Sequence, residues 1–495
     1  MRCARVLGAV VGLTVAGCGA GPTGPGAETP SGPVARPIRL ADTSAREFFS
    51  ALGQSGAGLQ GGGYATAWNV GTFPVVAVAV QLLRPDGSAL LPENGLVFAS
   101  DPVYTDQDAV VVAHPSSGVF VGFTRRDIYG NGSILVASLD GEGRTRWSAG
   151  VVEVAAPIGY EIHTNPQLAS DGAGGVYVCF QPHAFSRPST EVAIRCQHLD
   201  AGGATSWGRY GLLAGGREGQ RVVPRVVGDG AGGLMVFWRN QGEEDRPGEP
   251  MLMEGQHFTR DGARLWGEGL VIRRTNLPPF EGGHGFTFYD VVSDGRGGAV
   301  MSLDDLGTAG ATDTDVVAQR VAFDGSLQWG AGVTVAGGAS TQYHETLVAA
   351  PDGGAFIAVR ETLGSNRRRL LLHRLGPDGR QVWPAAGTAL SDPAATANSQ
   401  DAVGAYEAGT LWMAWTQQAG AASATFEARL ARFADDGRRL DDAAGAILRS
   451  EQGRAFFPRH AFLQSGRFFT ASDDAQLGAS GQSDVSATLV TLAPR

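Results

Sequence analysis

The amino-acid sequence predicts an all-β fold, a β-propeller of eight four-stranded antiparallel blades, and three observations point to it. A motif with an Asp-Gly turn recurs every 54 to 63 residues along most of the chain. A second motif, in which a Gly-rich turn opens an apolar strand, alternates with the first. Glycine makes up 73 of the 495 residues without a collagen period, about twice its usual share, which indicates many tight turns. Repeats of this length with four strands each are typical of propeller blades.

The first motif places a large apolar residue four positions after a glycine. Asp-Gly between two β-type segments is a strong hairpin signal, because glycine accepts the positive φ that a tight turn demands. We expect each tryptophan to pack between neighbouring blades and to bury about 200 Å². The pairs are Gly87/Leu91, Gly143/Trp147, Gly203/Trp207, Gly262/Trp266, Gly325/Trp329 and Gly379/Trp383, with a degenerate copy at Gly437 in which Leu440 is expected to replace the tryptophan.

The second motif is a Gly-rich turn followed by a strand with an aromatic or aliphatic residue near its end. Three copies begin with DGAGG or DGRGG, at Asp171, Asp229 and Asp294. Both faces of a blade pack on other blades, which explains why these strands are apolar on both sides. The terminal residues of the motif are Trp68, Phe123, Phe180, Trp238, Leu303, Val359 and Trp415, and SGRFFTAS near residue 466 is an eighth copy.

The register of the units also predicts how the ring closes. Full units cover 45–100, 105–155, 160–215, 221–273, 284–336, 343–391 and 398–449. The last stretch, 455–493, supplies three strands, and residues 37–41 (PIRLA) are similar to the fourth strands of other units. We therefore expect residues 37–41 to complete the last blade, which removes the exposed edges of an open array. Seven blades with a stray terminal hairpin is the alternative.

The unit resembles a class of secreted bacterial propeller repeats with the pattern D-I-Y-A-Q-R-L-D-x-x-G-x-x-x-W-G. The best local match is residues 315–320 (DVVAQR), continuing to Trp329-Gly330. The chain is more loosely similar to quinoprotein-type tryptophan-docking repeats and to Asp-box repeats, although no copy has the Ser-x-Asp-x-Gly spacing of the latter. The resemblance implies turns and blade docking rather than chemistry, and a propeller fold does not name a function.

The N-terminus carries an export signal. Arg2 and Arg5 precede a short apolar segment that ends in Val15-Ala16-Gly17-Cys18, and the segment is too short to span a bilayer. It resembles the lipobox of bacterial lipoproteins, which implies removal of residues 1–17 and acylation of Cys18; a plain secretory leader is the alternative. Gly19, in place of Asp, favours the outer membrane if the organism is Gram-negative. Residues 18–34 are predicted to form a flexible tether, and 35–495 a single propeller domain.

Composition excludes several functions. No lysine is present, so all 39 basic residues are arginine, which rules out Schiff-base chemistry and a lysine-dependent phosphate loop. The net charge of −10 argues against nonspecific nucleic-acid binding. We expect no cofactor, no metal site and no nucleic-acid partner, and we expect a monomer.

Two cysteines remain in the mature chain, Cys179 and Cys196. They are predicted to lie on neighbouring strands, and an oxidising compartment permits a disulfide between them. Two unpaired buried thiols are the alternative.

One set of candidate ligand-binding residues follows from position within the blade. The first strand of each propeller blade lines the central channel, and its start lies at the face that usually binds ligands. A ring of polar residues there would bind a polar ligand or a peptide; a merely wet channel mouth is the alternative. The aligned first-strand residues are Asp108, Gln167, Arg225, Asp290, Glu345, Asp401 and Arg459.

Long acidic loops are predicted at the same face, at residues 181–191, 239–250 and 304–315, and long loops on a rigid scaffold often carry recognition. The histidines show no metal-ligand spacing. His198, His257 and His373 alternate with apolar residues in predicted strands and read as satisfied strand histidines, whereas His163, His344 and His460 lie near first strands.

Three functions are compatible with these residues. The first is a lipid-anchored, noncatalytic binding or scaffolding module for an envelope protein or glycan. The second is a propeller glycan hydrolase or lyase. It requires two carboxylates among Asp108, Asp290, Glu345 and Asp401 within about 5–10 Å, one of them with a raised pKa. The third, a quinoprotein-like cofactor domain, is disfavoured because no cofactor motif is present.

Overall fold

The computed structural model describes most of the chain after residue 32. The described residues are 33–41, 46–49, 54–98, 103–155, 161–184, 193–215, 219–241, 251–274, 289–306, 314–364, 367–391, 398–420, 423, 425–476 and 483–492. The predicted leader, Cys18 and the predicted tether as far as residue 32 lie outside them. All regular elements among the described residues are strands, as the all-β prediction requires, and none of these residues forms a helix long and apolar enough to cross a membrane.

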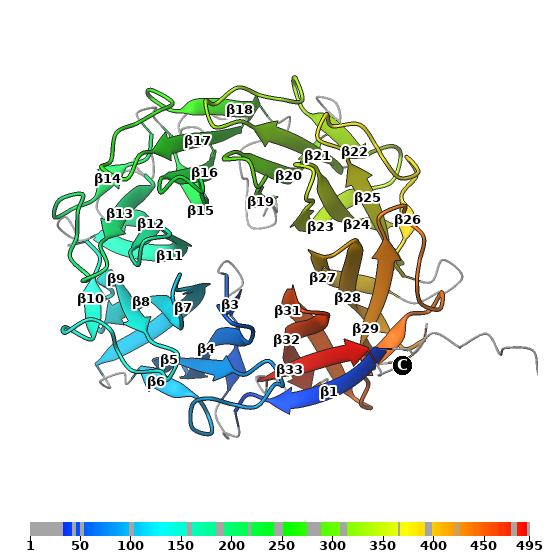
Figure 1. Ribbon diagram of the computed structural model, residues 1–495, viewed down its shortest axis with the longest axis horizontal. Coiled ribbons are helices and arrows are strands. Elements are labelled where there is room, and N and C mark those ends of the chain that lie inside the picture. The colour runs from blue at the N-terminus through cyan, green and yellow to red at the C-terminus, as the bar shows by residue number, and fades with distance from the viewer. Residues whose placement is uncertain are drawn as a thin grey trace, which may run out of the picture.

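The strands form antiparallel sets arranged about a central axis, which is the architecture of a β-propeller (Figure 1). Each set runs outward from a first strand near the axis. Two pairs of neighbouring sets join into eight-stranded sheets through one parallel bridge each, Ile162 to Gly132 and Phe426 to Ala455.

Strands β2 to β18 make up the first four sets. They are β2 (Glu47–Phe48), β3 (Gly56–Gly58), β4 (Tyr64–Thr72), β5 (Val75–Leu83) and β6 (Leu96–Phe98); β7 (Tyr104–Ala113), β8 (Val119–Asp127), β9 (Gly132–Leu139) and β10 (Val151–Glu153); β11 (Glu161–Ser170), β12 (Val176–Ala184), β13 (Arg195–Leu199) and β14 (Leu212–Leu213); and β15 (Arg221–Gly228), β16 (Leu234–Asn240), β17 (Leu252–Phe258) and β18 (Leu270–Arg274).

Strands β19 to β33 make up the remaining sets, with β1 added to the last. They are β19 (Tyr289–Ser293), β20 (Ala299–Leu306), β21 (Thr314–Val321) and β22 (Val333–Ala336); β23 (Gln342–Ala349), β24 (Ala355–Thr362), β25 (Arg368–Leu375) and β26 (Thr388–Ala389); β27 (Ser399–Glu407), β28 (Thr410–Gln418), β29 (Phe426–Ala434) and β30 (Ala446–Arg449); and β31 (Arg454–Gln464), β32 (Arg467–Gln476), β33 (Ser483–Leu492) and β1 (Pro33–Arg39).

The recurrent tryptophans dock each set on the next one, as predicted. The indole N–H of Trp207 donates to the carbonyl of Arg260 in the next Asp-Gly turn (3.0 Å). The glycine of that turn, Gly262, has φ +88°, and a Cβ there would lie 3.2 Å from the Trp207 ring. Trp147, Trp266, Trp329 and Trp383 make the same indole-to-carbonyl bond to the following set. The glycines therefore serve both the turn and the close approach of the tryptophan.

The degenerate seventh copy differs from the prediction. Leu440 does not occupy the tryptophan position: its N–H pairs with the carbonyl of Arg432, the pairing made elsewhere by the residue before the tryptophan. Asp441 follows it and forms an ion pair with Arg432 (2.7 Å). An ion pair thus replaces the indole in this set, and the prediction for Leu440 was wrong by one residue.

The aspartate of the DGxGG turns closes the turn and ties it to the third strand. Asp229 Oδ1 accepts the N–H groups of Ala231 and Gly233, and its Oδ2 lies 2.9 Å from His257 Nε2. Asp171 and His198 repeat this arrangement (3.1 Å). His198 and His257 are therefore buried strand histidines with hydrogen-bond partners, as predicted.

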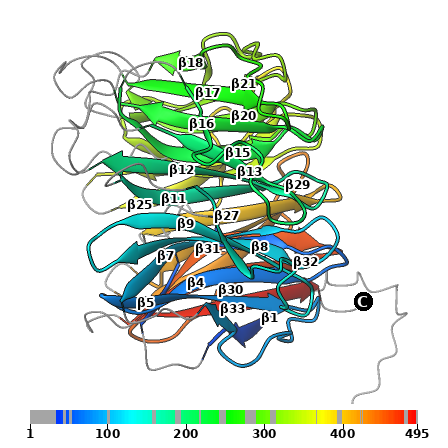
Figure 2. The same cartoon turned by 90° about the vertical axis from the view of Figure 1, so that its left-hand side faces the viewer.

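The N-terminal strand pairs with the last strand of the chain. In β1, Pro37 lies opposite Thr488 and Arg39 opposite Ser486 in β33, and both views show the two strands side by side (Figures 1 and 2). The strand begins at Pro33, two residues before the predicted domain boundary at 35. Ile38 packs where tryptophans pack in other sets: a Cβ on Gly87 would lie 2.5 Å from Ile38 Cδ1.

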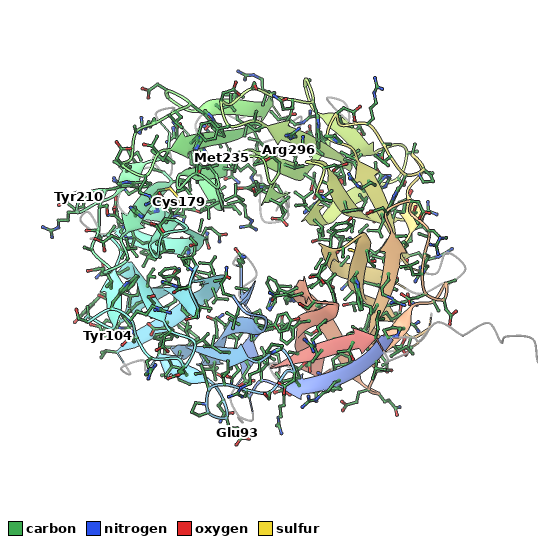
Figure 3. The ribbon with its side chains drawn as sticks, in the orientation of Figure 1. Glu93, Tyr104, Cys179, Tyr210, Met235 and Arg296 are labelled. Carbon is green, nitrogen blue, oxygen red and sulfur yellow. A yellow bond between two sulfur atoms is a disulfide. The ribbon has the colours of Figure 1, made fainter. Side chains whose placement is uncertain are left out.

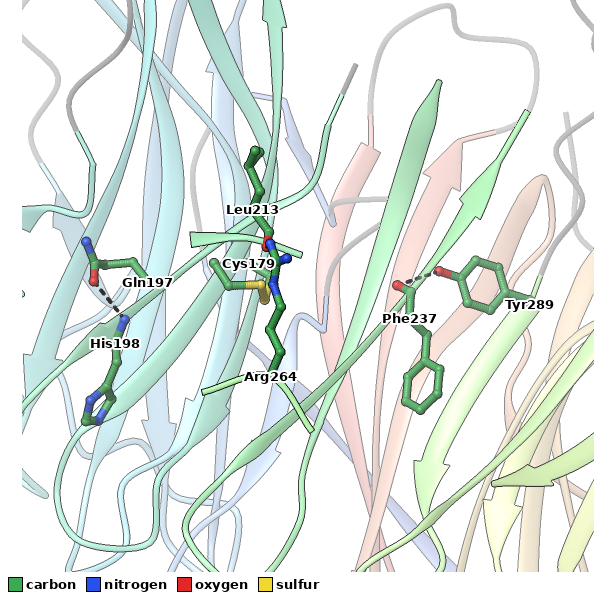
Figure 4. Close-up of a disulfide and its surroundings, with 8 residues drawn as sticks. Cys179, Gln197, His198, Leu213, Phe237, Arg264 and Tyr289 are labelled. Carbon is green, nitrogen blue, oxygen red and sulfur yellow. Dashed lines mark hydrogen bonds between the residues drawn. A yellow bond between two sulfur atoms is a disulfide. The ribbon is translucent and has the colours of Figure 1, made fainter. Parts of the chain in front are cut away.

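A disulfide joins Cys179 and Cys196, which lie opposite each other on β12 and β13. Their Cα atoms are 4.0 Å apart, within the separation of about 7 Å that a disulfide allows. Both residues are fully buried. Figure 3 shows Cys179 within the strand layer and Tyr210 at the outer edge, and Figure 4 shows the bridge beside Gln197 and His198.

We expect the double substitution Cys179→Ala/Cys196→Ala to lower the free energy of unfolding by about 3 kcal/mol, because a cross-link over a loop of this length restricts the unfolded chain. Urea unfolding followed by tryptophan fluorescence measures the change. Reductant should lower the stability of the wild type toward that of the variant and leave the variant unchanged. Equal stability of the oxidised wild type and the variant would contradict the bridge.

Candidate functional site

Six of the first strands have a β-bulge near their starts among the described residues. The register between first and second strand shifts in β7, β11, β15, β23, β27 and β31. A bulge places two residues opposite one and turns a side chain out of the strand pattern. Asp108, Glu345, Asp401 and Arg459 lie at these bulges. We call the end of the molecule that carries the bulges the inner rim.

Three of the seven predicted residues, Gln167, Arg225 and Asp290, do not lie at a bulge among the described residues. Asp108 and Asp401 have φ of 58° and 54° at their bulges, and Asn165 (54°) and Val223 (55°) occupy the same place in their sets. Gln167 and Arg225 lie two residues further along and resume the strand pairing. Asp290 likewise pairs with Ser302 without a register shift. The prediction of equivalent positions was therefore wrong for these three residues, because polar character alone did not locate the bulge.

Main-chain N–H groups at several bulges donate to a polar side chain from the preceding set. Ala402 N donates to Glu345 Oε2 (3.3 Å), Val223 N to Gln181 Oε1 (3.3 Å) and His344 N to Asp304 Oδ1 (2.5 Å). These bonds connect neighbouring sets at the axis. Glu345 thus has a structural contact in addition to any role toward a ligand.

Charged side chains gather at the inner rim, near the first strands of the last three sets, β23, β27 and β31. Arg360 Nη1 lies 3.1 Å from Glu345 Oε1, Arg459 Nη1 lies 3.8 Å from Asp401 Oδ1, and Arg459 Nε lies 2.6 Å from Asp473 Oδ2. We call these five residues the rim cluster. The Arg459 side chain is 38% exposed and that of Asp401 is 25% exposed, so this part of the cluster is open to solvent.

Burial dominates the electrostatics of the two carboxylates at the centre. It raises the pKa of Glu345 to about 7; Arg360 opposes the shift and the charge of Asp401 adds to it. Burial also raises the pKa of Asp401, and Arg459 opposes that shift. At neutral pH a large fraction of Glu345 therefore carries a proton, which gives the rim cluster a proton donor beside a carboxylate.

This pKa predicts a pH dependence of stability. The folded-state pKa of Glu345, about 7, exceeds the unfolded value, so its contribution is fully present below about pH 4.5 and is lost as the pH rises through 7. The loss reaches about 3 kcal/mol at most. Glu345→Gln keeps an acceptor for Ala402 N–H and does not titrate. We expect the difference in unfolding free energy between wild type and Glu345→Gln to change between pH 5 and pH 8; a constant difference would contradict the shift.

A second group of rim residues lies around Arg225. Its guanidinium lies 5.7 Å from the centre of the Tyr289 ring. Burial raises the pKa of Asp290 and Arg225 opposes that shift. Burial also lowers the pKa of His344 to about 3, and the neutral ring contacts Ser302 Oγ through Nδ1 (2.8 Å). Asp290 is on β19, which pairs with β20 without a register shift.

Burial also lowers the pKa of three further histidines, His163, His373 and His460. Burial lowers the pKa of His460 to about 3 and that of His373 to about 4; His163, beside Glu161 (3.5 Å), is shifted in the same direction. No group of three His, Cys, Asp or Glu residues that could hold a metal ion occurs in the described part of the chain. The acidic loop segments 185–191, 242–250 and 307–313 lie outside it.

Sequence reasoning missed Arg360, Asp473, Asp304 and Gln181. Each comes one residue after the second-strand position that the Gly-rich motif marks, as in Val359-Arg360 and Phe180-Gln181. These residues lie within the second strand beside the bulge of the first: Arg360 pairs with Tyr343 and Gln181 with Thr164. The residue following each motif was therefore a usable signal for the rim.

No protein-family model matches the chain, and no curated protein sequence matches it. Among solved structures the chain is similar to polysaccharide lyase Uly1 (TM-score 0.43, 8% identity, 82% of this chain and 93% of that one). It is also similar to puromycin hydrolase (TM-score 0.43, 14% identity, 90% of this chain and 61% of that one). A third similar structure is the β-propeller domain of the Trilobed protease from Pyrococcus furiosus (TM-score 0.39, 11% identity, 74% of this chain and 90% of that one). These likenesses concern the fold alone.

Proposed function

We propose that the chain is a closed eight-bladed propeller that acts as a noncatalytic binding or scaffolding module of the cell envelope. The blade count is supported by seven strand sets with their own fourth strand and a last set completed by β1. Closure is also supported by contacts between the two ends of the described chain. Tyr64 Oη donates to the carbonyl of Arg467 (2.9 Å), and its ring stacks on Phe469 (4.2 Å).

The rim cluster is the observation that carries the binding function. It offers the exposed guanidinium of Arg459 and the partly exposed carboxylate of Asp401 at one surface, so that a polar ligand finds a donor and an acceptor side by side. A protein or glycan of the envelope is the partner class that the proposal names. The propeller is proposed to act as a monomer.

Capture from envelope extract tests this function. Wild-type protein without its leader should retain a ligand that Arg459→Gln and Asp401→Asn retain at least tenfold less well. Arg438→Gln is the matched control, since Arg438 pairs with Asp436 in an exposed turn at the opposite end of the sets. Equal capture by wild type and both rim variants would rule out the cluster as the binding surface.

A glycan hydrolase or lyase is the second candidate, and the raised pKa of Glu345 beside Asp401 favours it. A protonated carboxyl near neutral pH is suited to act as a general acid, with the second carboxylate as base or nucleophile. Incubation with envelope polysaccharides should then release new reducing or unsaturated ends. Glu345→Gln should abolish the release of these ends and keep binding. If the wild type releases none, the enzyme hypothesis is wrong and the binding module remains as the proposal.

The anchor is proposed from the lipobox-like segment. If Cys18 is acylated, Cys18→Ser should move the protein from the membrane fraction to the soluble fraction or block its maturation. Fractionation and mass measurement of the N-terminal peptide check this, and Cys3→Ser is the control because Cys3 leaves with the leader. Unchanged membrane partitioning of Cys18→Ser would contradict the anchor. If the organism is Gram-negative, the protein is then proposed to lie at the outer membrane.

A further inference from the structure

A polar cavity of about 330 Å³ lies in the last strand set, apart from the rim cluster. The end of β1 forms one wall, and the ends or starts of β30, β31, β32 and β33 form the others. The charged residues that line it are Arg39, Arg449, Arg454, Asp474 and Asp484, and the remaining lining residues are Pro37, Ile38, Ala41, Val485 and Ser486. Its size is at the lower end of the range for small-molecule sites.

The cavity has an internal charge pattern. Arg449 Nη1 donates to Asp474 Oδ2 (2.8 Å) and to Ser486 Oγ, and its guanidinium lies over the Phe456 ring (4.4 Å). Arg454 Nη2 donates to Asp484 Oδ2 (2.8 Å). Three arginines and two aspartates thus line the cavity, and its described lining carries a net positive charge.

Two buried polar atoms of the lining have no hydrogen-bond partner among the described residues, Arg454 Nε and Asp474 Oδ1. Buried polar groups are nearly always hydrogen-bonded, and each exception requires an explanation. Arg454 Nε carries an N–H donor within a positively charged guanidinium, and Asp474 Oδ1 is an acceptor. A molecule that satisfies both must carry an acceptor, best an anionic one, and a hydroxyl or similar donor.

We propose that this cavity binds a small hydroxylated carboxylate of the size of one sugar acid. The ligand carboxylate accepts from Arg454, and a ligand hydroxyl donates to Asp474 Oδ1. An arginine–carboxylate contact of this kind is stronger than a contact between neutral groups. Because β1 forms one wall, the bound molecule also fastens the N-terminal strand to the last set, so that binding stabilises the folded state.

Isothermal titration of the mature protein with D-glucuronate tests the site, with D-glucose and acetate as comparators. Glucose has the hydroxyls without the carboxylate, and acetate has the carboxylate without the hydroxyls. We expect saturable binding of glucuronate at least tenfold tighter than that of either comparator, and a melting temperature that rises with glucuronate concentration. Absence of saturable glucuronate binding, or equal binding of glucose or acetate, overturns the proposal.

A matched pair of variants localises the binding. Arg454→Gln removes the proposed carboxylate donor and should weaken glucuronate binding at least tenfold. Asp484→Asn removes the ion-pair partner of Arg454 and one negative charge but leaves that donor in place, so binding should be kept or strengthened. Unchanged glucuronate affinity in Arg454→Gln overturns the site. The rim variant Arg459→Gln should bind glucuronate normally, which separates failure of this site from failure of the proposed rim function.

Discussion

Deleting residues 33–41 is expected to lower the melting temperature by about 5 to 10 °C. The deletion removes the seven paired residues of β1, the buried side chain of Leu40 and the partly buried side chain of Ile38, whose burial together contributes about 3–4 kcal/mol. It also leaves β33 as an open edge, which promotes aggregation. Calorimetry and light scattering during heating measure the two effects.

The control for this deletion is removal of residues 19–32, which precede the first described strand. We expect that change to leave the melting temperature within about 1 °C of the wild-type value, because the sequence predicts that these residues form a flexible tether. If the 33–41 deletion also leaves the melting temperature unchanged, β1 does not close the propeller. The repeat assignment would stand in that case, but the eight-blade proposal would not.

Trp207→Ala is expected to lower the free energy of unfolding by about 3–5 kcal/mol, the usual cost of truncating a large core aromatic. The indole is 6% exposed, lies 5.4 Å from both the Tyr177 and the Phe258 ring, and bonds to the next set through Arg260. Its loss removes packing on both sides of one contact between sets. Urea unfolding measures the change.

Two further variants separate packing from other effects. Trp207→Phe keeps a ring and removes the indole N–H, so it should cost about 1 kcal/mol for the lost hydrogen bond plus a smaller packing loss. Leu265→Ala, in the Asp-Gly hairpin of the next set and 42% exposed, should change stability by less than about 0.5 kcal/mol. Equal effects of Trp207→Ala and Leu265→Ala would contradict the docking role.

The parts of the fold that could be predicted from sequence depend on short-range signals. Asp-Gly turns, the DGxGG turns and the apolar strands between them repeat often enough to define the strand order. The same order placed Cys179 and Cys196 on neighbouring strands and residues 37–41 beside the end of the chain. Those pairings follow from strand order and register, which the repeat length determines.

The rim could be predicted only in part, because bulges change the register by a residue that no motif marks. Asn165 and Val223 occupy bulge positions that polar character assigned to Gln167 and Arg225. The rim cluster, moreover, forms between sets about 57 residues apart in sequence, as Glu345 and Ala402 are. The prediction for Leu440 was wrong for a related reason. A charged residue, Asp441, occupies the position where an apolar residue was expected, and its ion pair with Arg432 cannot be predicted from residue types alone.

Hydrogen–deuterium exchange with and without the captured envelope ligand tests the binding function most directly. The proposal predicts slower exchange in peptides that contain the bulges of β23, β27 and β31, and no change in the Asp-Gly turns at the opposite end of the sets. Protection restricted to those turns, with unchanged exchange at Glu345, Asp401 and Arg459, would contradict binding at the rim cluster.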